Sequence, residues 1–180
     1  VSGADTLGLS LLNANGFTNF PAPYGGSKES VKHQILIKAS ELTAAGMTYG
    51  SEINALAFDV AIVSTAGILS DYKISIAPTN VTVLTTWITA GLIPVFGPVN
   101  YQPVLGQNVH TFSSSYVWDG VSNIIVQTCF SNDPTNAGVF TTVNAIMQRT
   151  PTTGNTVIYA ALDNLDICPL TPSFLLSSLR

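Results

Sequence analysis

The stretch Tyr116–Phe130 constrains the fold of this chain more than any other, and it reads YVWDGVSNIIVQTCF. Two β-rich runs flank the pair Asp119-Gly120, which is a strong hairpin signal because glycine adopts the positive φ of the turn without steric cost. The second run, Asn123–Phe130, has apolar residues on both faces of an extended strand. We therefore predict a hairpin whose second strand lies at the centre of a sheet and is buried on both sides.

Apolar residues recur at every second position in other segments, which is the period of a strand with one buried face. The sequence predicts strands over Val1–Leu12, Val31–Ala39, Ile53–Ile62, Tyr72–Ala77, Val81–Trp87, Leu92–Phe96, Val109–Phe112, Val139–Ile146 and Thr156–Ala161. This makes about nine or ten short strands at intervals of about 10–15 residues, with almost no helix. We predict an all-β fold, an antiparallel β-sandwich that is jelly-roll-like.

Three segments carry finer predictions. Within Ile53–Ile62 we expect one face to point inward, and it consists of Leu56, Phe58, Val60 and Ile62. Pro94 places its segment at a sheet edge, because proline cannot donate to a strand ladder. The segment Ser40–Gly46 predicts one helical turn, with Ser40 as the N-cap and Gly46 as the stop.

The N-terminal segment, Val1–Leu12, carries three leucines at a spacing of two: Leu7, Leu9 and Leu11. A run rich in Asn, Pro, Gly and Ser follows over Asn13–Ser30, as is typical of a long loop. We therefore expect an N-terminal strand and linker over residues 1–20, and a single β-sandwich domain over residues 21–180. The strand either pairs within its own domain or acts as a donor strand that plugs its leucines into a neighbouring copy.

Charged residues make up only 9% of the chain, and the formal net charge is −4. This argues against nucleic-acid binding, because six Lys and Arg residues form no basic stripe to neutralise phosphates. The polar residues are mainly Thr, Ser, Asn and Gly, a mixture that suits secreted and fibre-forming β-proteins. No apolar run approaches the roughly 18 residues of a membrane helix. We expect an extracellular or cell-surface protein whose export signal has been removed before Val1.

The two cysteines, Cys129 and Cys168, permit one disulfide. Such a bond would close a loop of about 40 residues and tie the C-terminal segment to the predicted central strand. The alternative is a pair of separate buried thiols. Their spacing does not match a zinc site.

Residues with catalytic or metal-binding chemistry are scattered. A glycosidase needs two carboxylates that flank a cleft, and nothing in the sequence points to such a pair. Asp163–Asp166 offers oxygen atoms to Ca²⁺ but lacks the glycine and distal glutamate of an EF-hand loop, so we interpret it as a turn. His33 is interpreted as a hydrogen-bonded core residue, and His110 lies in a short strand outside any metal-binding pattern. We expect no enzymatic activity, no metal site and no cofactor.

Two further sets of residues suggest contacts with sugars. Four aromatic residues would form a sugar-stacking platform if they shared an exposed sheet face, although aromatics in strands more often lie in the core: Trp87, Tyr101, Tyr116 and Trp118. Asn80-Val81-Thr82 fits the N-glycosylation sequon, and Asp5-Thr6-Leu7 resembles an O-glycosylation sequon at Thr6.

Two blocks of sequence resemble a known module. The first is Pro21–Gly46, with a Pro-Tyr-Gly loop, a Lys-His-Gln strand and the turn ASELTAAG, and the second is Tyr116–Phe130. Together they resemble a β-sandwich module of secreted and cell-surface proteins of Bacteroidota-type bacteria. The resemblance implies an extracellular, non-catalytic module and supplies no catalytic residues. The leucine-rich N-terminus and apolar C-terminal tail are more similar to extracellular filament subunits that donate a terminal strand.

These observations predict a structural subunit of a pilus-like filament, whose partners are copies of itself. The alternative is a carbohydrate-binding or adhesive cell-surface module that contacts glycans, an inference that rests on analogy of fold. A hydrolase with an unrecognised carboxylate pair is the third hypothesis.

Overall fold

The computed structural model describes residues 12–13, 23–25, 28–65, 67–132, 144–149, 154–172 and 176–178. The helix in this part of the chain is α1 (Ala39–Ala44). The strands are β1 (Leu12–Asn13), β2 (Ser30–Ile37), β3 (Glu52–Thr65), β4 (Leu69–Thr79), β5 (Ile93–Tyr101), β6 (Gly106–Val117), β7 (Asn123–Ser131), β8 (Asn144–Arg149), β9 (Val157–Leu162) and β10 (Leu176–Ser178).

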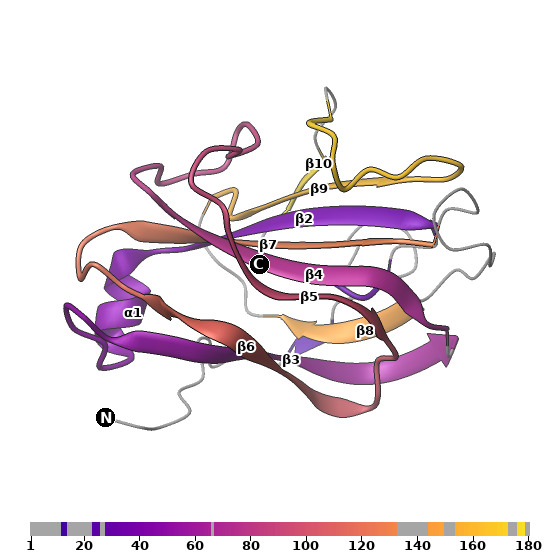
Figure 1. Ribbon diagram of the computed structural model, residues 1–180, viewed down its shortest axis with the longest axis horizontal. Helices are drawn as coiled ribbons and strands as arrows, with labels where there is room; N and C mark the ends of the chain where they lie inside the picture. Colours follow the sequence, from indigo (N-terminus) through magenta and orange to yellow (C-terminus); the bar gives the residue numbers. More distant parts are fainter. Residues whose placement is uncertain are drawn as a thin grey trace.

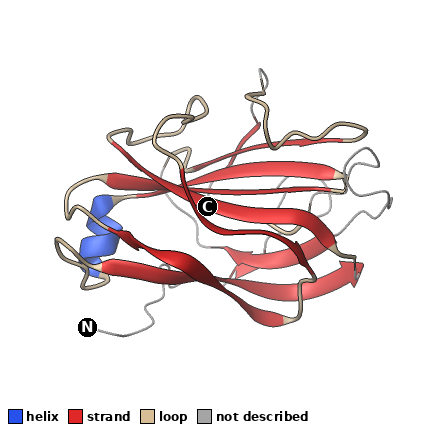
Figure 2. Cartoon of the chain, viewed as in Figure 1, coloured by secondary structure: helices blue, strands red, loops and turns tan. Residues whose placement is uncertain are grey.

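The strands form two sheets that lie one above the other (Figure 1). The first has four strands in the order β1-β8-β3-β6, and the second has six in the order β10-β9-β2-β7-β4-β5. Strand pairs in both sheets are antiparallel. The prediction of an all-β, antiparallel fold with little helix is confirmed (Figure 2).

Two hydrophobic clusters cover the two faces of the six-stranded sheet. The cluster between the sheets, called here the inner core, joins residues of both layers, such as Val60 and Met147 on one side and Ile74 on the other. The cluster on the far face of the six-stranded sheet, called here the outer core, consists of Leu36, Leu84, Trp87, Ile125, Cys129, Ile158, Ala160, Ile167 and Cys168. A sheet buried on both faces needs apolar residues at successive positions, as the sequence of β7 provides.

The central position predicted for Asn123–Phe130 is confirmed. Strand β7 lies between β2 and β4 in the middle of the six-stranded sheet. Its side chains divide between the two clusters: Val126 and Phe130 join the inner core, whereas Ile125 and Cys129 join the outer core.

The predicted hairpin is wrong, although its turn is present. Strand β6 belongs to the four-stranded sheet and β7 to the six-stranded sheet, so the chain crosses between layers here. The turn forms because the Asp119 carboxylate accepts hydrogen bonds from the backbone N–H groups of Val121, at 3.0 Å, and Ser122, at 2.8 Å. Trp118 is only 1% exposed and packs in the inner core, so the chain is drawn inward before the turn. Turn chemistry sets a local reversal but does not set which sheet the next strand joins.

The strand predicted over Val81–Trp87 is also wrong. The fully described loop between β4 and β5 contains no strand, and it lies over the outer face of the six-stranded sheet. Leu84 and Trp87 are its buried residues, and the Leu84 N–H donates to the carbonyl of Asn155 at 2.8 Å. Apolar residues that anchor a covering loop produce the same short apolar run as a strand, so the sequence pattern did not separate the two.

Strand β3 departs from the predicted alternation at one position. Ile62 is 46% exposed instead of inward, while Val63 packs against the inner core. The register of β3 against β8 shifts between Val60 and Ile62. A bulge of this kind adds one residue and moves the following side chains to the other face.

The short helix is present, but Ser40 is not its N-cap. Helix α1 begins at Ala39 with Lys38 as the N-cap residue, and the Glu41 carboxylate accepts the Lys38 backbone N–H at 2.8 Å. The side chain of Asn123 accepts the Ala39 N–H at 2.7 Å, so β7 supplies a second cap. Gly46 ends the helix with a φ of 84°, as predicted.

Cys129 and Cys168 form a disulfide in the outer core. It ties the segment after β9 to the central strand β7. The Lys32 ammonium group donates to the carbonyls of Cys168, at 3.2 Å, and Leu170, at 2.8 Å, and holds the same segment.

Candidate assembly site at the sheet edges

The first described strand of the chain lies at a sheet edge. Strand β1 pairs antiparallel with β8, with Leu12 opposite Arg149 and Asn13 opposite Gln148. On its other side β8 pairs with β3. The main-chain groups along the free side of an edge strand are a template for another strand, and here β1 uses that template.

Strand β8 brings the inner core up to this edge. Its residues Ala145 and Met147 are buried and belong to the inner core. A strand added beside β8 therefore meets main-chain donors and acceptors on one side and the margin of the inner core below. This combination can bind an extended segment with apolar residues at alternate positions.

The six-stranded sheet carries the other terminal strand at its edge. Strand β10 pairs antiparallel with β9, with Leu176 opposite Tyr159. Both strands nearest the chain ends thus occupy edges, one on each sheet.

The opposite edges, β5 and β6, are bound to each other. The Ser113 hydroxyl of β6 donates to the carbonyl of Val95 in β5 at 3.2 Å, and the Tyr101 hydroxyl donates to the side chain of Asn108 at 2.8 Å. Strand β5 also contains Pro94, whose ring nitrogen cannot donate, and the prediction of an edge strand there is confirmed. These features disfavour strand addition at β5.

The segment Pro23–Gly25 is held by its tyrosine. Tyr24 is fully buried in the inner core, and its Oη lies 2.5 Å from Nε2 of His110 in β6. Tyr72 and Tyr101 lie against the Tyr24 ring, with centroids 5.6 and 5.7 Å away. Burial lowers the pKa of His110 to about 4 and raises the pKa of Tyr24 far above its ordinary value, so both groups are neutral at pH 7.

The four aromatic residues of the sugar-stacking alternative lie in or against the two cores. Trp87 lies in the outer core at 9% exposure, while Tyr116 and Trp118 lie in the inner core at 6% and 1%. Tyr101 packs against the inner core from β5. The four rings therefore share no exposed face, because each fills space between layers instead of standing on a surface.

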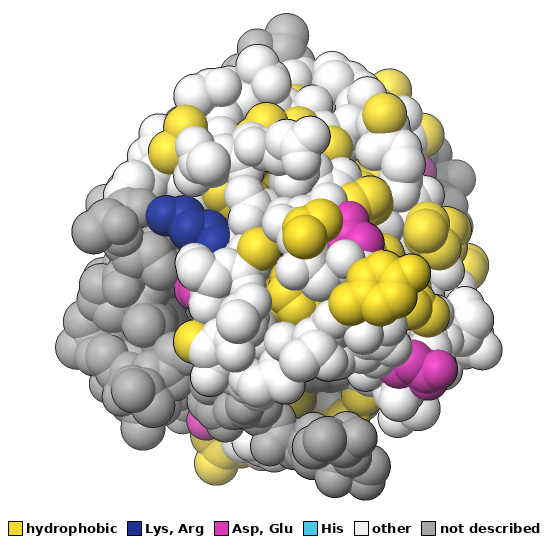
Figure 3. Space-filling model, turned by 90° about the vertical axis from the view of Figure 1, so that its left-hand side faces the viewer, with side chains coloured by type: hydrophobic (Ala, Val, Ile, Leu, Met, Phe, Trp, Pro, Cys, Tyr) yellow, Lys and Arg dark blue, Asp and Glu magenta, His cyan; other side chains and the backbone are white. Residues whose placement is uncertain are grey.

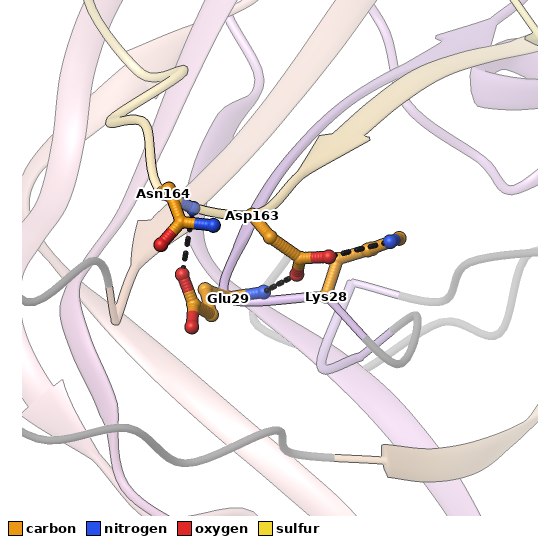
Figure 4. Close-up of polar contacts among 4 residues, drawn as sticks. All are labelled: Lys28, Glu29, Asp163 and Asn164. Carbon is orange, nitrogen blue, oxygen red and sulfur yellow. Dashed lines mark hydrogen bonds and ion pairs between the residues drawn. The ribbon is translucent and has the colours of Figure 1, made fainter.

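The segment Asp163–Asp166 makes turn contacts. The Asp163 carboxylate binds the Lys28 ammonium group at 2.5 Å and accepts the Glu29 N–H at 3.2 Å (Figure 4). The Glu29 carboxylate in turn accepts the Asn164 N–H at 2.7 Å, and that of Asp166 accepts the Cys168 N–H at 2.9 Å. The contacts of Lys28 and Glu29 with Asp163 and Asn164 join the start of β2 to the end of β9, and the bond to Asp166 is local to the following turn. The described residues contain no group of three or more His, Cys, Asp or Glu side chains placed to hold a metal ion.

The remaining predicted site residues are placed as follows. Thr6, Leu7, Leu9 and Leu11 lie outside the described residues. Asn80 is exposed in the loop after β4. His33 is buried with its ring 5.8 Å from that of Tyr159.

Sequence reasoning missed two buried residues. Tyr24 was read as part of a loop, and the aromatic residue between Pro23 and Gly25 was the signal for an anchored turn. Lys32 lies on the polar face of the alternation in β2, yet its ammonium group lies 5.5 Å from the ring centroid of Trp87 under the covering segments. No local pattern showed that its face of β2 is covered.

One end of the molecule exposes hydrophobic side chains among mostly uncharged neighbours (Figure 3). The loops that follow α1 and β6 contribute Tyr49 and Val121, which are 84% and 78% exposed. The backbone of Gly120 lies directly against Tyr49. No helix in the described part of the chain is long and apolar enough to cross a bilayer.

Comparison of the chain with protein-family models, with curated proteins and with solved structures returned no match.

Proposed function

We propose that this chain is a non-catalytic structural subunit of an extracellular, pilus-like filament, built on a jelly-roll-like β-sandwich. Subunits join when the N-terminal strand of one copy adds to the sheet edge of the next. The low charge and the Thr, Ser, Asn and Gly content support an extracellular setting. The resemblance of Pro21–Gly46 and Tyr116–Phe130 to a secreted surface module supports it as well.

One observation carries this proposal: the pairing of β1 with β8 at the edge of the four-stranded sheet. An N-terminal strand bound at an edge makes the same main-chain hydrogen bonds whether it comes from its own chain or from a neighbour. Nine residues, 14–22, link Asn13 to the segment Pro23–Gly25 that Tyr24 holds in the inner core, and the proposed exchange moves the strand on this tether.

The leucine pattern constrains the register of the proposed exchange. Ala145 and Met147 mark the positions of β8 that face the inner core. In the observed register, with Leu12 opposite Arg149, even-numbered residues would stand opposite these positions. Leu7, Leu9 and Leu11 are odd-numbered, so a donor strand that plugs them into the core must pair in a register displaced by an odd number of residues. A one-residue displacement exchanges the two faces of a strand, so the within-chain and exchanged states use different side chains.

The proposed exchange is favourable because of the leucines. Burial of three leucine side chains contributes roughly 5–8 kcal/mol before the cost of ordering the segment. In a donor register the three leucines would add apolar burial to the main-chain hydrogen bonds of the strand.

The test combines negative-stain microscopy of native material with measurement of the size of the assemblies that recombinant protein forms. We expect filaments from the native protein and none after deletion of Val1–Leu12. The combined substitutions Leu7→Asn, Leu9→Asn and Leu11→Asn should abolish assembly, while the folded domain persists by circular dichroism. Ser10→Asn on the other face is the matched control and should assemble normally. A native protein that stays monomeric at high concentration, or a deletion variant that still assembles, would overturn the proposal.

A further inference from the structure

The loop that follows β4 exposes both functional side chains of the sequon Asn80-Val81-Thr82. This loop joins β4 to β5 and lies over the outer core. Asn80 and Thr82 are exposed, whereas Val81 between them packs against the outer core. The amide and the hydroxyl that define the sequon are therefore both presented to solvent.

The backbone of the sequon is held in this orientation by its middle residue. The Val81 N–H donates to the hydroxyl of Thr79 at 3.3 Å, and the Val81 carbonyl accepts the side-chain amide of Asn123 at 2.8 Å. Because Val81 is fixed on the inner side, the side chains before and after it keep their outward direction.

The surface around the sequon is uncharged. No residue of the loop and its flanks, 78–92, is charged, and several of its exposed residues are threonines: Thr82, Thr85, Thr86 and Thr89. Val83 is 45% exposed beside Thr82. Since only 9% of the residues in the chain are charged, few charges keep its surface hydrated. A bulky, hydrated group on Asn80 would supply this hydration and cover Val83.

The sequon lies away from the proposed assembly edge. Strand β4 belongs to the six-stranded sheet, whereas β8 lies beside the edge strand β1 of the four-stranded sheet. The loop covers the outer face of the six-stranded sheet, on the side opposite to β8 (Figure 1). A group attached to Asn80 therefore does not compete with a strand that adds at β8.

We propose that Asn80 carries an N-linked glycan. Its Nδ2 forms a bond to the anomeric carbon of a glycan held on a lipid pyrophosphate. The bond from that carbon to the pyrophosphate oxygen breaks, the lipid pyrophosphate leaves, and one proton is lost from Nδ2. The Thr82 hydroxyl is the recognition element, because the sequon requires Ser or Thr two residues after Asn. The proposal rests on export of the chain, which is part of the proposed function, but not on filament formation.

The test is mass spectrometry of chymotryptic peptides from protein purified from its native source, with fragmentation that keeps glycans on their residue. We expect the peptide that contains Asn80 to carry the mass of a glycan, located on Asn80 itself. Asn164 is the control, because it is equally exposed but is followed two residues later by Asp166 instead of Ser or Thr. An unmodified Asn80 in the native protein would overturn the proposal, as would sugars carried by the threonines of the loop instead.

Two substitutions at Thr82, made in the native source, test the recognition step. Thr82→Ala should abolish the glycan, whereas Thr82→Ser should retain it. Because the side chain is exposed, both variants should keep the circular dichroism spectrum of the wild type. A glycan retained in Thr82→Ala would contradict the proposal.

Microscopy of the same native material separates this proposal from that of the filament. Filaments built from subunits with unmodified Asn80 would overturn the glycan and leave the assembly proposal intact. Glycosylated protein that stays monomeric at high concentration would support the glycan and overturn the filament.

Discussion

Lys32 and Lys73 flank Cys129 on opposite sides in the same register, because β2 and β4 both pair with β7 at that residue. The two lysines therefore share the outer face of the six-stranded sheet. Only Lys32 is buried, and its ammonium group donates to the carbonyls of Cys168 and Leu170. Lys32 thus holds the covering segment in place. This pair offers a direct comparison of a buried and a half-buried cation on one sheet.

The first prediction concerns this comparison. Lys32→Met keeps the apolar stem but leaves the two carbonyls without their donor, so we expect a loss of about 2–3 kcal/mol in the free energy of unfolding. Lys73→Met should change it by less than about 0.5 kcal/mol. Urea denaturation of both variants measures the difference. Equal effects would show that Lys32 contributes no more than a surface residue.

The second prediction concerns the disulfide. The bond joins residues 39 positions apart, so the double variant Cys129→Ala and Cys168→Ala should lose about 3–4 kcal/mol of stability through loop entropy. Guanidinium denaturation of the oxidised wild type and the variant gives this value. Wild type treated with reductant should behave like the variant, and a loss below about 1 kcal/mol would contradict the prediction.

The third prediction concerns glycine in the crossover turn. Gly120 has a φ of 77°, and a Cβ there would lie 3.0 Å from the Cα of Tyr49. Gly46 has a φ of 84° and open space around it, so it is a matched control without the clash. We expect Gly46→Ala to cost about 1 kcal/mol for the positive φ alone, and Gly120→Ala to cost about 1–3 kcal/mol more. Thermal unfolding compares the two variants. Similar midpoints for Gly46→Ala and Gly120→Ala would contradict an added cost from the close contact with Tyr49.

The fourth prediction is the pH dependence of global stability. The unfolded chain binds a proton at His110 below pH 6.5, whereas burial lowers the pKa of His110 in the folded chain to about 4, so the unfolded state holds more protons in this interval. Stability should therefore be highest above pH 6.5 and fall by up to roughly 3 kcal/mol toward pH 4.

His110→Phe provides the control for this titration. Its stability curve over the same interval should lack the His110 contribution. Urea denaturation at half-unit steps of pH measures both curves. Parallel curves for the two proteins would contradict the prediction.

Sequence periodicity predicted those features that depend on neighbours along the chain. The two-faced burial of β7 follows from apolar residues at successive positions, and the stop of α1 follows from Gly46. The Asp119-Gly120 turn also forms as expected, since its hydrogen bonds join residues within three positions. The predicted alternation of inward and outward side chains fails where a bulge shifts the register, as at Ile62.

The candidate assembly site was predictable only in part. The alternating leucines and the long linker pointed to an N-terminal strand, and the structure adds that its described part, Leu12–Asn13, pairs at the edge of β8. The partner strand, β8, lies more than 130 residues away along the chain, so no local sequence pattern identifies it. The partners of the aromatic residues are not readable from the sequence for the same reason, because Trp87 and Trp118 are buried by segments remote in sequence.

The sequence by itself determined an all-β chain with a doubly buried strand over Asn123–Ser131 and a tight turn before it, because strand period and turn chemistry act over a few residues. The tertiary structure alone decided that this turn joins two sheets, that a loop covers Lys32, and that Tyr24 meets His110 across 86 residues. Those outcomes depend on which surfaces remain to be covered once the strands have formed, and burial of one segment by another is a property of the whole packed chain.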